Sequence, residues 1–379
     1  MLVNLKVLEL ANVLAGPSVG QFFAELGAEV IKVENLKTGG DVTRTWKLAG
    51  EQTDDRSAYF CSVNWGKKSI AVDLTTGEGK AIIQKLAAKS DIIIASYKPG
   101  DPEKLGVAYE QLRTTNEQLI YGQITGYGSN NDRVGYDAVL QAESGFMDLN
   151  GEKDGPPVKM PVALIDVLAG HQLKEGLLLA LLNRERTGRG DLVEVSLIET
   201  AVSSLANQAS NWLVAKKLPT RQGSAHPNIA PYGETFETAD DKLVLLAIGT
   251  DRQFLDLCVV LGIDFKNLGD KFSTNTSRVE SRVELGAMLA PKFKQRESIE
   301  LMEKIHSKKI PAGIIQNVKE ALEMPGLESI FLNAHQQTGI RNFVASFPLS
   351  NSKLSMNILP PPHFGEHTKE ILENISHWL

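Results

Sequence analysis

Residues 5–125 alternate short β-type runs with segments of helical periodicity, and this alternation most constrains the fold. Strands joined by helices in this order form right-handed crossovers, which build a mainly parallel sheet covered by helices. We therefore expect an α/β fold whose first half is doubly wound and Rossmann-like. The expected strands are KVLELA, EVIKVE, SIAVDL, DIIIAS and QLIYGQI, and the helices between them lie near 18–26, 77–89 and 102–115.

The middle of the chain continues this large domain. A long helix is expected from Asp166 to about Arg186, because apolar residues recur at helical spacing until the RTGRG turn stops it. A strand, DLVEVSL, and a helix over 197–215 follow, before a Pro- and Gly-bearing linker, KKLPTRQGSAHPNIAPYG. We therefore place a large domain at residues 1–215.

The remaining sequence predicts a smaller α+β domain with its linkers over 216–324. Residues 325–379 are irregular and Pro-rich, so we expect them to return to the large domain instead of forming a core of their own. The elements expected in the small domain are a hairpin of GETFET and KLVLLAI, helices near 251–261, 278–291 and 296–307, and a PAGIIQ strand.

Composition and charge exclude several classes of protein. The 379 residues are 42% hydrophobic and 23% charged, with a net charge of −6 and no basic run, so a nucleic-acid partner is not expected. Cys61 and Cys258 are the only cysteines, and they lie far apart without metal-type spacing, which excludes a disulfide framework and a thiolate zinc site, and the histidines form no metal motif. The chain starts without signal-peptide features and has no apolar run long enough for a bilayer, so we expect a cytoplasmic protein without a membrane partner.

One acid, Asp166, interrupts the apolar run PVALIDVLAG. Burying a carboxylate is costly unless it is hydrogen-bonded or paired. Because a helix is expected to begin here, Asp166 could cap it, as Asp commonly does. The same position could also hold a poorly solvated carboxylate that acts as a nucleophile. Both interpretations stay open from the residues alone.

The first strand–turn–helix–strand unit offers a second candidate site. Its AGPSVG turn begins a helix, whose free N–H groups can bind phosphate, and Glu34 ends the next strand, where an acid can bind ribose hydroxyls. The turn has fewer glycines than the nicotinamide fingerprint, so a dinucleotide dehydrogenase and a plain βαβ unit are both possible. Lys98 and Lys104 follow a strand, where a polyphosphate could bind.

Taken in order, these stretches resemble the family III CoA-transferases (the CaiB/BaiF type), which include formyl-CoA transferase and carnitine CoA-transferase. The resemblance implies a Rossmann-like large domain, a small domain and an interlocked homodimer. It covers nearly the whole chain through LANVLAGPSVGQFFAELGAEVIKVE, GGDVTRTW, NWGKKSIAVDL, YKPGDPEKLG, GYDAVLQAESGFM, PVALIDVLAGHQL, RTGRGDLVEVSLIET, HPNIAPYGETFET and IPAGIIQNVKEAL.

The resemblance also implies a set of site residues. Asp166 matches the family's nucleophile, and the substrates would be an acyl-CoA and a carboxylic acid, with no permanently bound cofactor and no metal. The chain departs from the formyl-CoA transferase pattern at Asn35, where that pattern has a basic residue, and at Ser96 and Tyr97, where it has Asn and Phe. The positions that match family contacts to CoA are Val13, Leu14, Ala15, Val72, Thr75, Ser96, Tyr97, Lys104 and Tyr136.

The expected activity is transfer of CoA between two carboxylic acids, which makes the chain a transferase of sulfur-containing groups. The route that the resemblance implies runs through an aspartyl anhydride and an aspartyl-CoA thioester on Asp166. The alternatives are the related α-methylacyl-CoA racemase, a NAD-dependent dehydrogenase and a silent CoA-binding subunit. Racemase chemistry uses a His in the GYD element, where this chain has Tyr136, and a phenol is a poor base at neutral pH. The identity of the acids and the role of the 222–231 loop do not follow from the sequence.

Overall fold

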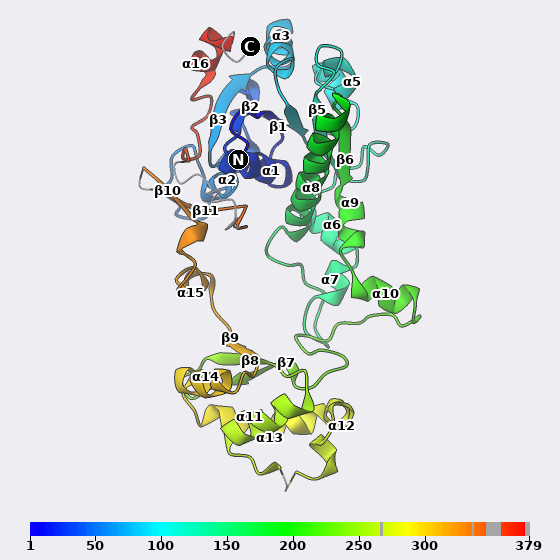
Figure 1. Cartoon of the computed structure of the whole chain (residues 1–379), viewed down its shortest axis with the longest axis vertical. Helices are drawn as coiled ribbons and strands as arrows, with labels where there is room; N and C mark the ends of the chain where they lie inside the picture. The colour runs from blue at the N-terminus through cyan, green and yellow to red at the C-terminus, as the bar shows by residue number, and fades with distance from the viewer. Residues whose placement is uncertain (266–267, 336, 346–357, 376–379) are drawn as a thin grey trace. The chain divides into compact units, whose positions relative to one another are not determined.

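The computed structural model describes residues 1–265, 268–335, 337–345 and 358–375 (Figure 1). It divides into two compact units. The first unit comprises Met1–Met147, Lys159–Lys217 and Gly326–Leu379, and the second comprises Asp148–Val158 and Leu218–Pro325.

A six-stranded sheet forms the centre of the first unit, and each pair of neighbouring strands is parallel. The strand order is β3-β2-β1-β4-β5-β6, so the order reverses between β1 and β4, as in Rossmann-like folds. The expected α/β class with a parallel sheet is confirmed. The strands are β1 (Lys6–Leu10), β2 (Glu29–Asn35), β3 (Lys67–Val72), β4 (Ile92–Ala95), β5 (Ile120–Thr125) and β6 (Leu192–Ser196).

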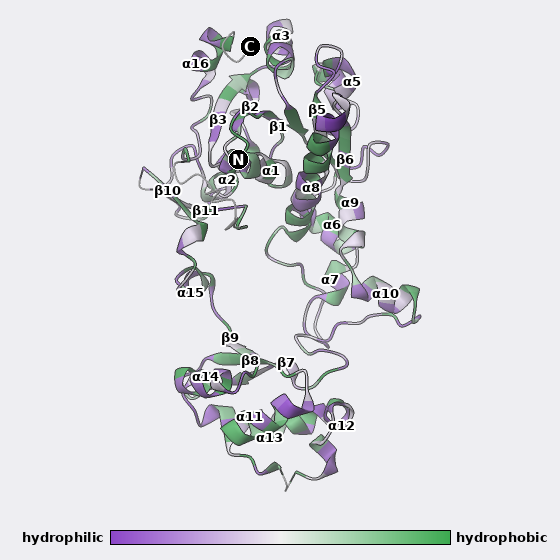
Figure 2. Ribbon diagram, viewed as in Figure 1, coloured by the Kyte–Doolittle hydropathy of each residue, from purple (hydrophilic) through white to green (hydrophobic). Residues whose placement is uncertain are grey.

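Helices cover both faces of this sheet, so its central strands are apolar on both faces (Figure 2). Successive residues of β4 show this: Ile92 and Ile94 pack with Phe22 of α1 and Leu173 of α8, whereas Ile93 packs on the other face with helix α3. The main helices of the unit are α1 (Ala15–Glu25), α3 (Gly77–Ala87) and α8 (Leu164–Thr187).

Two helices expected from the sequence are each divided in two. The segment near 102–115 forms α4 (Asp101–Leu105) and α5 (Tyr109–Leu112), because Gly106 adopts a left-handed conformation (φ +74°) and ends α4. The segment 197–215 forms α9 (Leu197–Ser203) and α10 (Asn207–Leu213), with Ala206 at φ +49° between them. The unit also contains three short helices, α2 (Ala58–Cys61), α6 (Asp137–Glu143) and α16 (Thr368–Glu373). Its other elements are the 3₁₀ turns Leu36–Thr38, Val42–Thr45 and Glu328–Ile330 and a hairpin of β10 (Phe331–Ala334) and β11 (Gln337–Ile340). Helix α7 (Phe146–Leu149) begins in this unit and ends in the second.

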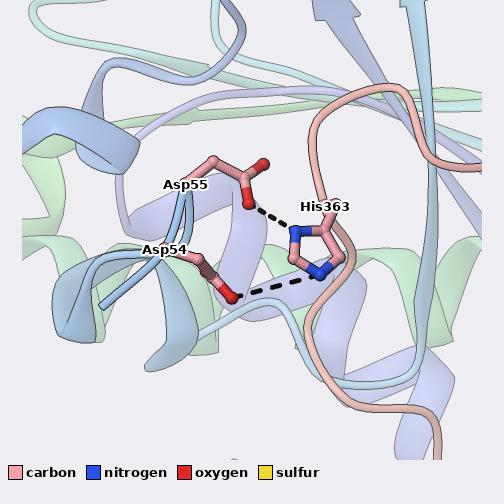
Figure 3. A group of neighbouring side chains, drawn as sticks. All are labelled: Asp54, Asp55 and His363. Atoms are coloured by element: carbon pink, nitrogen blue, oxygen red, sulfur yellow. Dashed lines mark hydrogen bonds and ion pairs between the residues drawn. The ribbon is translucent and has the colours of Figure 1, made fainter. Parts of the chain in front are cut away.

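The C-terminal segment packs against the edge of the large sheet at β3. Ile371 of α16 joins the apolar core on the α3 face, and the backbone N–H of His367 donates to the carbonyl of Ser69 at 2.9 Å. A surface cluster of Asp54, Asp55 and His363 also connects this segment to an earlier loop, since His363 Nδ1 lies 2.5 Å from Asp55 Oδ1 (Figure 3).

The second unit is an α+β fold with its own apolar core. It contains an antiparallel sheet in the order β7-β8-β9. Its helix near 278–291 forms two shorter ones, because Ser281 leaves helical geometry. The elements are β7 (Tyr232–Glu237), β8 (Leu243–Ala247), β9 (Ala312–Ile314), α11 (Asp251–Leu261), the 3₁₀ turn Asp270–Phe272, α12 (Asn275–Glu280), α13 (Arg282–Lys294), α14 (Ser298–Ser307) and α15 (Val318–Leu322).

The division into units differs from the sequence-based boundaries of 1–215 and 216–324 in one segment. Residues 148–158 belong to the second unit, although the sequence places them in the large domain. Arg221 holds this segment by donating to the carbonyl of Asp148 at 2.7 Å, and the N–H of Val158 closes it by donating to the carbonyl of Asn150 at 3.1 Å. These contacts could not be read from local sequence.

Within the described residues, none of the helices combines the length and the apolarity needed to cross a lipid bilayer.

Candidate active site

The candidate site lies where the strand order of the large sheet reverses, beyond the carboxyl ends of β1 and β4. Ligands of open α/β sheets bind at this position. The loop after β1 leads into α1, and the loop after β4 begins at Ser96, whose Oγ accepts from the backbone N–H of Asn12 at 3.1 Å. This bond fixes the two strand-end loops to one another.

Three cavities lie in this region of the first unit. The strand-end cavity, about 230 Å³, is lined by Val13, Ala15, Ser96, Tyr97 and Asp166 among others. The Thr75 cavity, about 120 Å³, lies next to it and shares Asn12 and Tyr97 as wall residues. The Trp46 cavity, about 450 Å³, shares five wall residues with the strand-end cavity: Val13, Leu14, Tyr136, Asp137 and Asp166.

Asp166 borders both of the larger cavities. It lies in the first turn of α8 and is only 9% exposed. Its carboxylate accepts no hydrogen bond from any of the described residues. Burial, and secondarily the charge of Asp137, raises the pKa of Asp166 to about 7. The structure therefore holds a poorly solvated carboxylate at the junction of two cavities.

Asp166 does not cap α8, so that interpretation of the sequence is wrong. The cap position is Ala163, and the capping carboxylate belongs to Asp137 of α6. Its Oδ1 accepts from the backbone N–H of Ile165 at 2.7 Å and of Asp166 at 3.3 Å. Because Asp137 satisfies these helix-end donors, the side chain of Asp166 is left free to face the cavities.

The turn that carries Val13 is strained and is held by a buried acid. Val13 has φ +72°, which is rare for a β-branched residue. The carboxylate of Asp41 accepts from the Val13 N–H at 3.3 Å and pairs with Lys32 at 2.9 Å. Burial alone would raise the pKa of Asp41, but Lys32 and the hydrogen bonds from Thr43 outweigh it and lower that pKa. This charged network lies beneath the site and fixes the start of α1.

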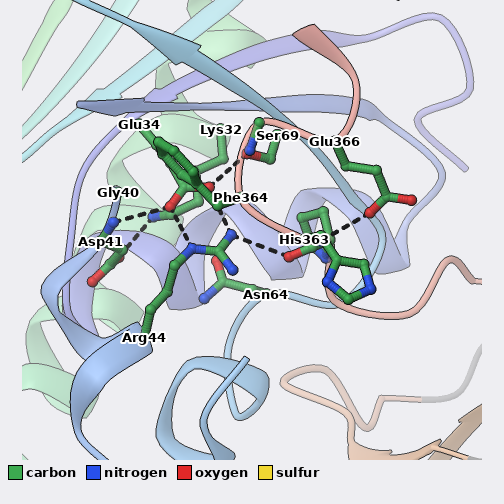
Figure 4. Close-up of polar contacts among 12 residues, drawn as sticks. Lys32, Glu34, Gly40, Asp41, Arg44, Asn64, Ser69, His363, Phe364 and Glu366 are labelled. Carbon is green, nitrogen blue, oxygen red and sulfur yellow. Dashed lines mark hydrogen bonds and ion pairs between the residues drawn. The ribbon is translucent and has the colours of Figure 1, made fainter. Parts of the chain in front are cut away.

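Glu34 belongs to the same buried network and is not available to a ribose (Figure 4). Arg44 contacts both of its carboxylate oxygens, at 2.7 and 2.8 Å, and Ser69 donates to it at 2.5 Å. Arg44 also donates to the carbonyl of Pro362 at 3.1 Å. The interpretation of Glu34 as a dinucleotide-binding acid is therefore wrong, because its acceptors are already occupied.

Most of the residues expected to contact CoA line the first two cavities. Val13, Leu14, Ala15, Ser96 and Tyr97 line the strand-end cavity, together with Tyr136, and Val72 and Thr75 line the Thr75 cavity. Burial raises the pKa of Tyr97 to about 12, so its phenol stays protonated.

Lys104 is the exception among these expected contacts. It lines none of the three cavities, and its ammonium group pairs with Asp101 at 3.1 Å on the surface. Three other cations lie closer: Lys98 and Arg133 line the strand-end cavity, and Lys37 Nζ contacts Thr75 Oγ1 at 2.6 Å and pairs with Asp73 at 3.1 Å. Lys37 supplies a positive charge two residues after Asn35, where the family pattern has a basic residue.

The sequence did not single out several residues that border Asp166. Asp137 directly follows Tyr136, an expected CoA contact, in the GYD element. This adjacency is the sequence signal that could have indicated Asp137 as a site residue. Trp46 and Tyr59 lie more than 100 residues before Asp166, and Lys159 lies seven residues before it in the loop that leads to α8, where no local pattern marks it as a site residue. The 222–231 loop lies in the second unit, where Arg282 donates to the carbonyls of His226 at 2.6 Å and Ile229 at 2.9 Å.

The parallel sheet, the cavities at its strand ends and the buried acid that borders two of them define an α/β protein with a candidate active site. A model of CoA-transferase family III matches residues 2–368. The chain is 37% identical over 385 residues to a succinate–glutarate CoA-transferase of Agrobacterium fabrum, covering 99% of this chain and 95% of that protein. It is 34% identical over 380 residues to the human succinyl-CoA:glutarate CoA-transferase, covering 99% of this chain and 86% of that protein.

A solved structure agrees with these matches. The crystal structure of a CaiB/BaiF family protein from Brucella suis aligns with a TM-score of 0.89 at 38% identity, and the alignment covers 99% of both chains. The chain belongs to CoA-transferase family III and is an enzyme of the CoA-transferase class, whose substrates are CoA thioesters. The racemase and dehydrogenase alternatives find no support in these comparisons.

Proposed function

We propose that this enzyme transfers CoA from an acyl-CoA to a free carboxylic acid, with Asp166 as the nucleophile. The position of Asp166 carries the proposal. Its carboxylate is nearly buried, accepts no hydrogen bond from the described residues and borders two cavities at once. A carboxylate with so little solvation is a stronger nucleophile than one in water.

The proposed reaction proceeds through two kinds of covalent intermediate on Asp166. Its carboxylate oxygen attacks the thioester carbon and the C–S bond breaks. This step releases CoA thiolate and forms a mixed anhydride on Asp166. The thiolate then attacks the Asp166 carbonyl carbon, which releases the donor acid as a carboxylate and forms an aspartyl-CoA thioester. The acceptor carboxylate attacks this thioester, which expels CoA thiolate and forms a second anhydride. Attack of the thiolate on the acceptor's acyl carbon gives the new acyl-CoA and restores Asp166.

The strand-end cavity and the Thr75 cavity form the proposed CoA site. They share wall residues, and the first of them borders Asp166, so the pantetheine arm would extend from the Thr75 cavity toward the nucleophile. Lys98 supplies positive charge for the CoA phosphates at the strand-end cavity, and Lys37, which pairs with Asp73 beside the Thr75 cavity, adds a second ammonium group. The first N–H groups of α1, at Ala15 and Gly16, have no partners within the helix and line the same cavity, so they can stabilise the oxyanion of each tetrahedral step.

The proposed acids are dicarboxylic acids. Two relatives that match nearly the whole chain are named for succinate and glutarate, each of which carries two carboxyl groups.

The proposed enzyme is a homodimer of interlocked subunits. In support, α8 and α10 expose apolar side chains that a second copy of the chain would cover. Light scattering after gel filtration should give twice the chain's mass of 41.4 kDa, and a single-chain mass would contradict this part of the proposal. The exposed residues include Leu179 (66%), Leu182 (59%), Leu213 (66%) and Val214 (82%).

Trapping the covalent intermediate tests the proposed function. The enzyme would be incubated with succinyl-CoA or glutaryl-CoA and then reduced with borohydride, and peptide mass spectrometry would locate the reduced residue. We expect reduction at Asp166, and loss of exchange in Asp166→Ala with CoA binding retained. Asp154→Ala, an exposed acid in the second unit, is the matched control. Trapping at another residue, or substantial exchange by Asp166→Ala, would show that the nucleophile is assigned wrongly.

A further inference from the structure

The Trp46 cavity meets the strand-end cavity at Asp166 and has walls that the proposed CoA site lacks, among them Trp46, Tyr59 and Lys159. It borders Asp166 and Asp137, but it has no wall residue in common with the Thr75 cavity. Its volume of about 450 Å³ is the largest of the three. If CoA reaches Asp166 through the strand-end cavity, the Trp46 cavity is the space that remains for the acid.

One cationic side chain, Lys159, lines the Trp46 cavity among the described residues. It has no ion pair in the described part of the chain, and its Nζ makes only a long hydrogen bond, 3.4 Å, to the carbonyl of the adjacent Met160. Arg133 at the strand-end cavity differs, because it pairs with Glu143 and lies 4.5 Å from the centre of the Tyr127 ring. Lys159 therefore has a positive charge that no carboxylate of the described residues neutralises.

The remaining walls suit a short ligand with an apolar middle. The rings of Trp46 and Tyr59 meet edge to face, with centroids 5.1 Å apart, and Val162 adds an aliphatic surface. Burial and the negative charges of Asp166 and Asp137 raise the pKa of Tyr59, so its phenol stays protonated and can donate a hydrogen bond. Methylene groups fit such walls, and an anionic group fits beside Lys159.

We infer that the Trp46 cavity binds the acid and that Lys159 selects dicarboxylic acids by pairing with the carboxylate that does not react. The reacting carboxyl group then faces Asp166, with the aliphatic chain against Trp46 and Tyr59. This inference rests on the proposed function, because it takes Asp166 as the group that forms the anhydride. It adds the location of the acid and the residue that determines its class.

Competition between two acceptors of equal length tests Lys159. With succinyl-CoA as the donor, glutarate and pentanoate have the same number of carbons and differ in the far carboxylate. Both acceptors react with the same aspartyl-CoA intermediate, so the ratio of their kcat/KM values is independent of the donor step. We expect Lys159→Gln to raise the KM for glutarate about tenfold or more with little change in kcat, and to leave kcat/KM for pentanoate nearly unchanged.

Charge reversal gives a second readout that a merely destabilised variant could not produce. Lys159→Glu should prefer 5-aminopentanoate, whose ammonium group takes the place of the far carboxylate of glutarate. Lys89→Gln, an exposed lysine on the surface after α3, is the matched control and should keep the wild-type acceptor ratio. Thermal unfolding curves would show that the variants are folded.

Two failures can be told apart. An unchanged glutarate-to-pentanoate ratio in Lys159→Gln overturns the inference alone, and equal use of the two acids by the wild type overturns both the inference and the proposed preference for dicarboxylic acids, while CoA transfer through Asp166 stands in either case. Absence of transfer from any acyl-CoA to any acid by the wild type overturns the proposed function itself, and this inference with it.

Discussion

Asp137 caps the helix that carries Asp166. One carboxylate oxygen of Asp137 receives the backbone N–H groups of Ile165 and Asp166, at 2.7 and 3.3 Å. The two acids thus have separate roles: one accepts the backbone N–H groups at the helix start, and the other presents its carboxylate to the cavities. Asp137 satisfies the backbone N–H groups, whereas the carboxylate of Asp166 accepts no hydrogen bond from the residues that the structure describes, and burial and its neighbour raise its pKa to about 7. The reactivity proposed for Asp166 depends on this division.

The rate of CoA transfer should depend on pH through Asp166. Only the carboxylate attacks a thioester, so kcat/KM should rise about tenfold per pH unit below pH 7 and level off above it. Asp137→Asn removes the secondary cause of the raised pKa and keeps an oxygen for the cap. Its midpoint should therefore be lower than that of the wild type, yet above the ordinary value, because burial persists. A profile that is flat from pH 5.5 to 8.5 would contradict this account of Asp166.

Replacing the proposed nucleophile should abolish transfer and stabilise the fold above pH 7. The pKa of Asp166 is higher in the folded chain than its ordinary value of 3.8, so the folded state binds the proton more tightly and loses stability as the pH rises from about 4 to about 7. Asp166→Asn removes this cost, which is at most about 4 kcal/mol. We expect a higher Tm than the wild type at pH 8 and a smaller difference at pH 4.5. A variant less stable than the wild type at pH 8 would argue against a buried charge.

The cap itself can be tested by comparing two variants of Asp137. Asp137→Ala should lower the free energy of unfolding by about 1 kcal/mol, because the N–H groups of Ile165 and Asp166 lose their acceptor. Asp137→Asn should lose much less, since its amide oxygen can still accept. Urea unfolding at pH 8 measures both. Equal stability of the two variants would mean that the cap contributes little.

The order of elements in the large sheet is predictable because each strand is locally distinctive. The segment DIIIAS is apolar on both faces, which predicts a central strand. Its parallel pairing with β1 confirms that position. Helix boundaries are less predictable. The break at Gly106 depends on its left-handed backbone conformation, and a glycine can also stand inside a helical pattern without ending the helix. The break near Ala206 has no local signal in the sequence.

The candidate site is predictable where its residues come from one local pattern. Asp166 is visible as a lone acid in an apolar run, and the turn from Val13 to Ala15 follows a strand. The cap on α8 is not visible, because Asp137 lies 28 residues before Ile165 in the chain. Lys159 and Tyr59 meet at one cavity only after the fold forms, so neither their order nor their spacing indicates a site.

The contact between α1 and α8 should control the alignment of the site. Gly170 lies one turn after Asp166 on α8, and a Cβ there would be 2.5 Å from Ser18 Oγ and 3.2 Å from the carbonyl oxygen of Ala15. Ser18 cannot simply rotate away, because its hydroxyl donates to that carbonyl at 2.7 Å. Gly170→Ala should therefore push α1 away from α8, lower stability by about 1–3 kcal/mol and reduce kcat by about tenfold to a hundredfold.

A second substitution and a matched glycine distinguish this effect from general loss of stability. Adding Ser18→Ala to Gly170→Ala makes room for the new methyl group, so part of the stability and part of kcat should return together. Gly286→Ala in α13 meets no atom within 4 Å and should be neutral or slightly stabilising, as expected of an ordinary helical glycine. If Gly170→Ala keeps full kcat, the distance between the start of α1 and Asp166 does not limit the reaction, and the oxyanion role of the α1 N–H groups loses its support.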